Sequence, residues 1–197
     1  MEAPTTKKLS NKDKMMTAAI DLMAERGYKG VSTKEIAASA GFSEMTLFRY
    51  FGSKRKLLEE AIDRFYYTGE MQRIFAEEMV WDLRNDLLLI SKTYHEIMHQ
   101  NRKLIRIVLQ DNELADLRKH AEKHPRQLKE RLTDYFESMQ SKGRMIPTRS
   151  EAQAMTFMWM NYGAFMTGLY GASSMTAVSL EEFMQSSIEL FARGLTT

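Results

Sequence analysis

Residues 32–54 read STKEIAASAGFSEMTLFRYFGSK, a run that contains the starts of two short helices on either side of a turn. Ser32 followed three residues later by Glu35 is the capping box that opens a helix. Gly41 permits a tight turn, and Ser43 can cap a second helix. A short helix, a turn containing glycine and a second short helix form the helix-turn-helix arrangement, whose second helix enters the major groove of DNA.

Apolar and polar residues separate onto two faces of this run. The spacing of six residues predicts an inward face that packs on a preceding helix: Ile36, Ala37, Ala40, Phe42, Leu47 and Phe51. The residues of the second helix that then point outward are Glu44, Met45, Thr46, Phe48, Arg49 and Tyr50. Thr46, Arg49 and Tyr50 can donate hydrogen bonds to phosphates or base edges, and Lys54 begins a further helix whose free N–H groups favour a phosphate. An ordinary helical hairpin with a charged surface has the same pattern, so this alternative stays open.

The composition limits what the rest of the chain can be. Its 197 residues are enough for one large domain or two smaller ones. The absence of cysteine excludes disulfides and thiolate metal sites. Residues 1–56 carry 11 Lys and Arg against 6 Asp and Glu, whereas the remainder carries 17 against 20. The basic N-terminal part indicates a module that binds a polyanion, and the lack of an apolar leader in the first residues predicts a cytoplasmic location.

Helix punctuation recurs along the chain and strand alternation is scarce, so we predict an all-α fold. Ser10 opens the first helix and Gly27 ends it. The prediction is an N-terminal three-helix helix-turn-helix domain plus a larger C-terminal helical bundle that dimerises. The expected boundaries are 1–52 for the DNA-binding domain, 53–68 for a connecting helix that ends at Gly69, and 69–197 for the effector-binding and dimerisation domain.

The run GYKGVSTKEIAASAGFSEMTLFRYFGSKRKLL resembles the DNA-binding region of the tetracycline repressor (TetR) family, with the likeness covering residues 12–60. The resemblance implies a homodimeric repressor with an all-α C-terminal domain that binds a small effector. It implies DNA contacts at Thr33, Ser43, Thr46, Phe48, Arg49, Tyr50 and Lys54. Met45 stands where the family usually has a small residue, and Phe48 stands where tyrosine is common, so an apolar contact with a thymine methyl is expected there. Glu44 can accept from a cytosine amine or simply favour the helix dipole.

Residues 152–180 contain no charged side chain, which predicts a helix buried on most sides. A plain core helix and a membrane span are alternatives, but polar residues interrupt the run, and a span needs about 20 predominantly apolar residues. We expect one face on an interior cavity and another on a dimer partner, with no membrane contact. The methionines and rings favour an apolar or aromatic effector, contacted by Tyr94, Met98, Phe136, Met139, Met155, Met158, Trp159, Tyr162, Phe165 and Met166. Small residues and the last helix would form the four-helix dimer interface through Ala164, Gly168, Ala172, Phe183, Met184, Ser187, Ile188 and Phe191.

One catalytic motif competes with this interpretation. Residues 95–99 read HEIMH, in which His95 and His99 could bind zinc with Glu96 as a general base and Glu113 as a third ligand. A zinc-dependent hydrolase is therefore one alternative, and a helical adaptor dimer that does not bind DNA is another. We favour a ligand-responsive regulator without enzymatic activity, a metal or a cofactor. It would repress transcription by binding a near-palindromic operator as a dimer, and its effector would release it from the DNA.

Overall fold

A computed structural model describes residues 9–65, 69–171 and 176–196, and the described residues contain helices but no strand. The all-α prediction is confirmed. The chain divides into two compact units, one made of residues up to Phe65 together with 103–120, and the other made of 66–102 and 121–197.

The first unit contains the predicted helix-turn-helix. Its helices are α1 (Asn11–Arg26), α2 (Thr33–Ser39), α3 (Glu44–Phe51), α4 (Lys54–Phe65), most of α7 (Arg102–Gln110), a 3-10 turn (Asn112–Leu114) and most of α8 (Ala115–Ala121). Gly27 follows α1 at φ 74°, as predicted for a glycine that ends a helix. Ion pairs fasten residues 103–120 to this unit, because Lys103 contacts Asp21 at 2.6 Å and Lys29 contacts Glu113 at 2.7 Å.

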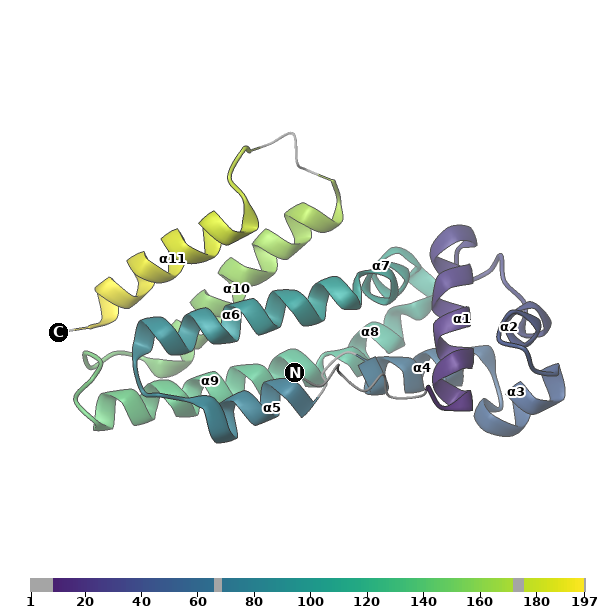
Figure 1. Ribbon diagram of the computed structural model, residues 1–197, viewed down its shortest axis with the longest axis horizontal. Helices are drawn as coiled ribbons and strands as arrows, with labels where there is room; N and C mark the ends of the chain where they lie inside the picture. Colours follow the sequence, from purple (N-terminus) through teal and green to yellow (C-terminus); the bar gives the residue numbers. More distant parts are fainter. Residues whose placement is uncertain (1–8, 66–68, 172–175, 197) are drawn as a thin grey trace, which may run out of the picture. The chain divides into compact units, whose positions relative to one another are not determined.

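The second unit is a bundle of long helices. It contains α5 (Gly69–Arg73), a π-helical turn (Ile74–Glu78), α6 (Leu83–Gln100), α9 (Lys123–Ser141), α10 (Ser150–Leu169) and α11 (Leu180–Leu195). In Figure 1 the four long helices run lengthwise through this unit, with α5 beside them. Helix α10 packs on α9 and α6, and α11 packs on α6.

The boundaries differ from the sequence prediction in two places. Residues 103–120 were assigned to the C-terminal domain, but they pack with the first unit. Gly69 was expected to end the fourth helix, but α4 ends at Phe65 and Gly69 begins α5. Glycine is common after helices, but it also occurs at their first residues. The presence of Gly69 alone therefore did not show whether it ends one helix or begins the next.

A buried carboxylate organises one end of the second unit. Asp86 accepts a hydrogen bond from the Tyr135 hydroxyl at 2.7 Å and another from the Val80 backbone N–H at 2.9 Å. Burial, followed by the contact with Asp86, raises the pKa of Tyr135. Trp81 stacks on Tyr135 with ring centroids 5.8 Å apart.

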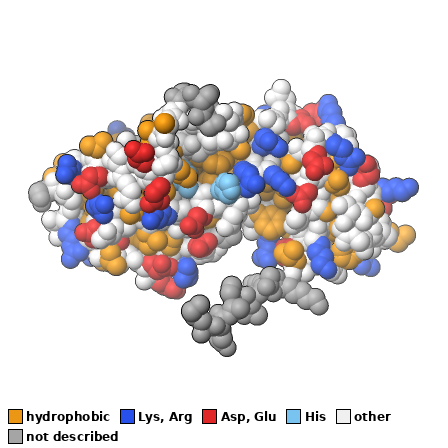
Figure 2. Space-filling view, turned by 45° about the horizontal axis from the view of Figure 1, so that its top comes forward, with side chains coloured by type: hydrophobic (Ala, Val, Ile, Leu, Met, Phe, Trp, Pro, Cys, Tyr) orange, Lys and Arg blue, Asp and Glu red, His pale blue; other side chains and the backbone are white. Residues whose placement is uncertain are grey.

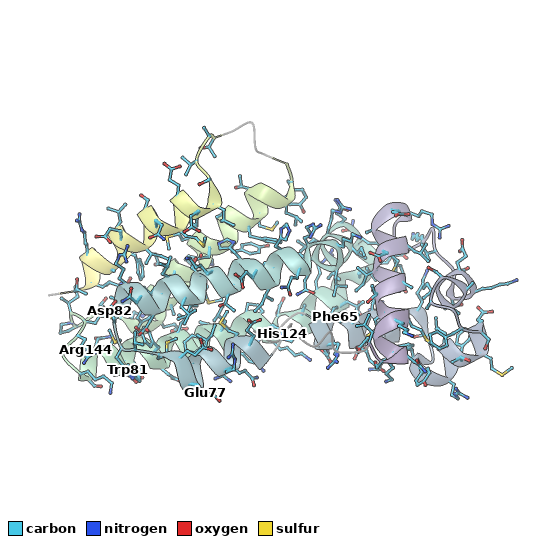
Figure 3. All side chains as sticks on the ribbon, viewed as in Figure 1. Phe65, Glu77, Trp81, Asp82, His124 and Arg144 are labelled. Atoms are coloured by element: carbon cyan, nitrogen blue, oxygen red, sulfur yellow. The ribbon has the colours of Figure 1, made fainter. Side chains whose placement is uncertain are left out.

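The backbone of Trp81 has φ 61°, an unusual value for a bulky residue. The Arg144 guanidinium holds the Trp81 carbonyl at 2.7 Å, and Figure 3 shows the two residues at the same end of the unit. These contacts fix the entry of the chain into α6, whose first turn is capped by Asp82.

We predict that Tyr135→Phe lowers the free energy of unfolding by about 1–3 kcal/mol, because Asp86 then loses a buried hydrogen-bond donor. Chemical denaturation monitored by circular dichroism measures the change. Tyr170→Phe is the matched control, since Tyr170 is 56% exposed and its loss of a hydroxyl should change stability by less than about 0.5 kcal/mol. Equal effects of the two substitutions would contradict the role given to Asp86.

Candidate nucleic-acid interface

Capping interactions set the positions of the two short helices. At the start of α2, the Glu35 carboxylate accepts from the Ser32 backbone N–H at 2.8 Å, and the Glu35 backbone N–H donates to the Ser32 hydroxyl at 3.2 Å. This is the predicted capping box, and it is confirmed. Ser43 caps α3 by accepting the Thr46 backbone N–H at 3.2 Å.

The turn between α2 and α3 is closed by backbone hydrogen bonds. The Phe42 N–H donates to the Ala37 carbonyl at 2.8 Å, and the Gly41 N–H donates to the Ala38 carbonyl at 3.1 Å. Gly41 has φ +79°, a conformation that side chains other than glycine rarely adopt. This glycine therefore sets the angle at which α3 leaves α2.

The inward face forms as predicted. Ile36, Ala37 and Leu47 are fully buried and Phe51 is 4% exposed. Ala40 and Phe42 are half-buried at the edge of the same face. Since α3 is only eight residues long, burial of Leu47 and Phe51 determines which of its sides faces outward.

The outward side of α3 combines apolar and polar side chains. Met45 is 82% exposed and Phe48 is 46% exposed. Arg49 is exposed and its guanidinium lies 5.6 Å from the centre of the Tyr50 ring, which is half-buried. Arg49 and Tyr50 are thus accessible on the surface, as the DNA-binding hypothesis requires.

Four polar residues predicted to contact DNA are hydrogen-bonded to one another in two pairs. The Thr33 hydroxyl donates to the Glu44 carboxylate at 2.6 Å, which joins the first residues of α2 and α3. The Ser43 and Thr46 hydroxyls lie 2.9 Å apart. Contact with Thr33 adds a third interpretation of Glu44, because its carboxylate holds the two helices together.

Lys54 lies differently from the sequence expectation. Its ammonium group donates to the carbonyls of Tyr28 and Val31, both at 2.7 Å, and lies 4.2 Å from the centre of the Tyr28 ring. Burial lowers the pKa of Lys54. The side chain therefore ties α4 to the loop that follows α1, and any phosphate contact here would fall to the backbone N–H groups at the start of α4.

Basic side chains are not gathered into one field on the face shown in Figure 2, where they alternate with acidic ones. Lys12 pairs with Glu60 at 2.7 Å and Arg26 pairs with Glu35 at 2.8 Å. Lys7 and Lys8, two of the basic residues counted in the N-terminal part, lie outside the described residues. The ion pairs leave the exposed Arg49 of α3 as a donor for a nucleic acid.

The predicted effector residues fall into three groups in the second unit. The buried ones are Tyr94, Met98, Phe136, Met139 and Phe165, and the half-buried ones are Met155, Met158 and Met166. Trp159 and Tyr162 are 67% and 42% exposed. These two were expected at an interior cavity, but they lie on the outer surface of α10, because Phe157, Asn161 and Phe165 take its buried side.

The predicted dimerisation residues are also divided. Phe183, Ser187, Phe191 and Ala164 are half-buried and Gly168 is exposed, whereas Ala172 lies outside the described residues. Met184 and Ile188 are 6% and 1% exposed, so they belong to the core of their own chain rather than to a free surface. A helix that is apolar on several sides does not reveal by sequence which side its neighbours cover.

A buried polar cluster joins α6 to α10. The Ser91 hydroxyl donates to the Asn161 side-chain oxygen at 2.5 Å, and the His95 Nε2 lies 3.2 Å from the same oxygen. Burial lowers the pKa of His95, despite an opposing contribution from the hydrogen bond with Asn161. The cluster was missed as a unit, although an amide in the middle of an uncharged run was a signal for it.

The structure argues against the zinc site, because His95, one of its suggested ligands, belongs to this polar cluster. His95 is buried and bonded to Asn161, while His99 is exposed. Glu113, the suggested third ligand, pairs with Lys29. Across residues 9–65, 69–171 and 176–196, no group of three His, Cys, Asp or Glu side chains is arranged to hold a metal. Within the same residues, no helix is both long and apolar enough to cross a membrane.

Comparison with known proteins now adds an independent finding. Residues 15–61 match the family model described as bacterial regulatory proteins, tetR family. The chain is 30% identical over 195 residues to the Uncharacterized HTH-type transcriptional regulator YvkB of Bacillus subtilis, covering 98% of each protein. The chain belongs to the TetR family of transcriptional regulators.

Solved structures share the fold of this TetR-family regulator. NalD of Pseudomonas aeruginosa, the secondary repressor of the MexAB-OprM multidrug efflux pump, superimposes with a TM-score of 0.73 at 18% identity, over 94% of this chain and 96% of its own. FadR of Bacillus subtilis, a transcriptional regulator in complex with stearoyl-CoA, gives a TM-score of 0.70 at 19% identity, over 92% and 97%. The family resemblance, the all-α fold and the regulatory rather than enzymatic class predicted from the sequence are confirmed.

We predict that the Glu35 carboxylate of the regulator titrates with a pKa of about 2, because the Ser32 backbone N–H, the Ser32 hydroxyl and Arg26 all stabilise its charged form. Its capping contribution to stability should be complete above pH 4.5, the ordinary value, and decline as the pH falls toward 2. Carboxyl chemical shifts in NMR measure the midpoint. Ser32→Ala should move it upward, and a midpoint near 4.5 in the unchanged protein would show that the capping box is not formed in solution.

Proposed function

We propose that this regulator is a repressor that binds a near-palindromic operator as a homodimer and leaves it when a small apolar or aromatic effector binds. The observation that carries the DNA-binding part is the two-sided character of α3, with Leu47 buried and Arg49 exposed on the same short helix. Second helices of this motif lie in the major groove, where arginine can bond guanine bidentately. The names of relatives support repression, since the HTH-type transcriptional repressor KstR2 of Mycolicibacterium smegmatis is 26% identical over 110 residues.

The proposed DNA contacts are those of the outward side of α3 and its surroundings: Thr33, Ser43, Glu44, Met45, Thr46, Phe48, Arg49, Tyr50 and the N-terminal end of α4 at Lys54. Arg49 and Tyr50 supply hydrogen-bond donors, and Met45 and Phe48 supply apolar contacts. Thr33 has a positioning role through Glu44, because its hydroxyl is already bonded there.

The proposed dimer interface lies on the outer surfaces of α10 and α11. Trp159 and Leu190 are 67% and 68% exposed, and Tyr162 and Leu180 are 42% and 45% exposed. Trp and Tyr are enriched in protein interfaces, particularly in their buried centres. A dimer that binds a near-palindromic operator presents its two recognition helices to half-sites about 34–36 Å apart on successive turns of DNA.

The proposed effector site is the interior of the second unit, near the buried rings and methionines. Tyr94, Met98 and Phe165 are buried there and would contact an apolar effector, with Met98 as the adaptable side chain. The neighbouring Ser91, His95 and Asn161 offer hydrogen-bonding groups on α6 and α10. Release of the regulator from its operator by apolar compounds, followed in the binding assay below, tests the proposed effector site.

We expect the regulator to act in the cytoplasm, where its DNA would be found.

We predict that an operator enriched by unbiased selection with the purified protein is a near-palindrome, and that Arg49→Ala weakens its binding by about 1–3 kcal/mol. Affinity should fall with salt at a slope of about −0.9 per phosphate contact in a plot of log K against log salt concentration. Fluorescence anisotropy measures both quantities. Arg149→Ala is the matched control, because Arg149 is exposed in the second unit.

The pattern of loss also identifies the kind of contact that Arg49 makes. Loss of a base contact would relax the sequence preference at one position, whereas loss of a phosphate contact would weaken all sequences alike and reduce the salt slope by about one. The absence of any enriched sequence, with residual DNA binding unchanged in Arg49→Ala, would contradict the proposal that α3 reads an operator.

We predict that Trp159→Glu converts the dimer to a folded monomer, because it introduces a charge into the proposed apolar interface and the side chain is not part of the core of its own chain. Analytical ultracentrifugation reports the mass, and circular dichroism reports the fold. Ser141→Glu, at another exposed position of the second unit, should remain dimeric. A Trp159→Glu protein that is still a dimer would place the interface elsewhere.

A further inference from the structure

Sulfur chemistry in this chain is restricted to methionine, and one methionine differs from the others that the structure describes. The sequence has 16 methionines and no cysteine. Eight of the described methionines, among them Met15 and Met184, are buried, and five, including Met160, are half-buried. Met45 is 82% exposed. It is therefore the described thioether most accessible to a reagent in solution.

Met45 lies on the outward side of α3. Met45 is the second residue of α3, and Phe48 lies one turn further along the same side. The opposite side carries the buried Leu47 and Phe51. Met45 is thus an apolar group on the surface proposed to enter the major groove, and it adds nothing to the core of its own unit.

We propose that Met45 is an oxidation site through which a hydroperoxide weakens operator binding, an inference that rests on the proposed DNA-binding function. The thioether sulfur attacks one oxygen of hydrogen peroxide, so that an S–O bond forms and the O–O bond breaks. Sulfur loses two electrons, the peroxide is reduced, and the departing oxygen leaves as water after taking up the protons. The product is methionine sulfoxide, which methionine sulfoxide reductases convert back to the thioether.

Oxidation changes the physical character of the contact rather than the fold. The thioether is apolar and can lie against a thymine methyl group. The sulfoxide carries an oxygen that accepts hydrogen bonds, and this oxygen would lose its water among base-edge acceptors and phosphates. A buried acceptor without a donor is costly, so we expect operator affinity to fall by about tenfold or more. The fold should not change, because Met45 is exposed in the free protein.

The experiment uses the full chain and its selected operator, with hydrogen peroxide as the oxidant. Peptide mass spectrometry follows the oxidation of each methionine, and anisotropy follows operator affinity in the same samples. Met45→Leu keeps an apolar side chain of similar size and cannot be oxidised, so its affinity should be the same after treatment as before, whatever its starting value. Met45→Gln imitates the polarity of the sulfoxide and should weaken binding without peroxide. Met160→Leu is the matched control, since its Met45 remains oxidisable and its affinity should fall as in the unchanged protein.

Two further results are expected if the inference holds. Operator DNA should slow the oxidation of Met45 and leave that of Met160 unchanged, and methionine sulfoxide reductase should restore affinity. Equal affinity of the protein before and after its Met45 is oxidised would overturn the inference, as would equal losses in the unchanged protein and in Met45→Leu. Either result would leave the proposed function intact, whereas failure to bind any selected DNA before treatment would refute the proposed function itself.

Discussion

The first unit depends on the burial of one side of a helix too short to form alone. Helix α3 has eight residues, and isolated helices of fewer than about 12–15 residues are marginal in water. Its stability must therefore come from Leu47 and Phe51, which are 0% and 4% exposed. Because these two side chains point inward, Met45 and Arg49 have to point outward. The packing that makes α3 a helix is also what presents its other side to a partner.

Because α3 depends on packing against its own unit, the residues at its two ends must hold it in one position. Ser32 and Ser43 cap α2 and α3 through backbone N–H groups. Gly41 adopts a positive φ. Lys54 adds a longer-range restraint by binding the carbonyls of Tyr28 and Val31, which connects α4 to the end of α1. Rigid placement of this kind is what a surface needs if a few side chains are to discriminate base edges.

Local signals in the sequence predicted this unit well because its determinants are local. A capping serine and a carboxylate three residues later, or a glycine at a helix end, lie close together in the chain, and Ser32, Glu35 and Gly27 all behave as expected. Lys54 was different, because its partners are 23 and 26 residues away. Its place at the start of a helix predicted an exposed side chain near a phosphate, and nothing nearby in the sequence indicated the two carbonyls. A long-range hydrogen bond has no periodicity through which a single sequence could reveal it.

The second unit was less predictable for a related reason. Residues 152–180 are uncharged throughout, so the pattern could not assign Trp159 and Phe157 to opposite sides of α10. Burial of Phe157, at 2% exposed, and exposure of Trp159, at 67%, follow from the neighbours α9 and α6. Asn161 was the informative residue, because a buried amide needs partners and finds them in Ser91 and His95.

The path of the chain bears on how an effector could act. Residues 103–120 come from the middle of the C-terminal sequence, yet ion pairs such as Lys103–Asp21 hold them in the first unit. The chain therefore passes between the units at three places, after Phe65, at Arg102 and after His120. Because an effector shifts an equilibrium only through its different affinities for two states, the proposed release from the operator requires an effector that binds the DNA-free state more tightly than the DNA-bound state.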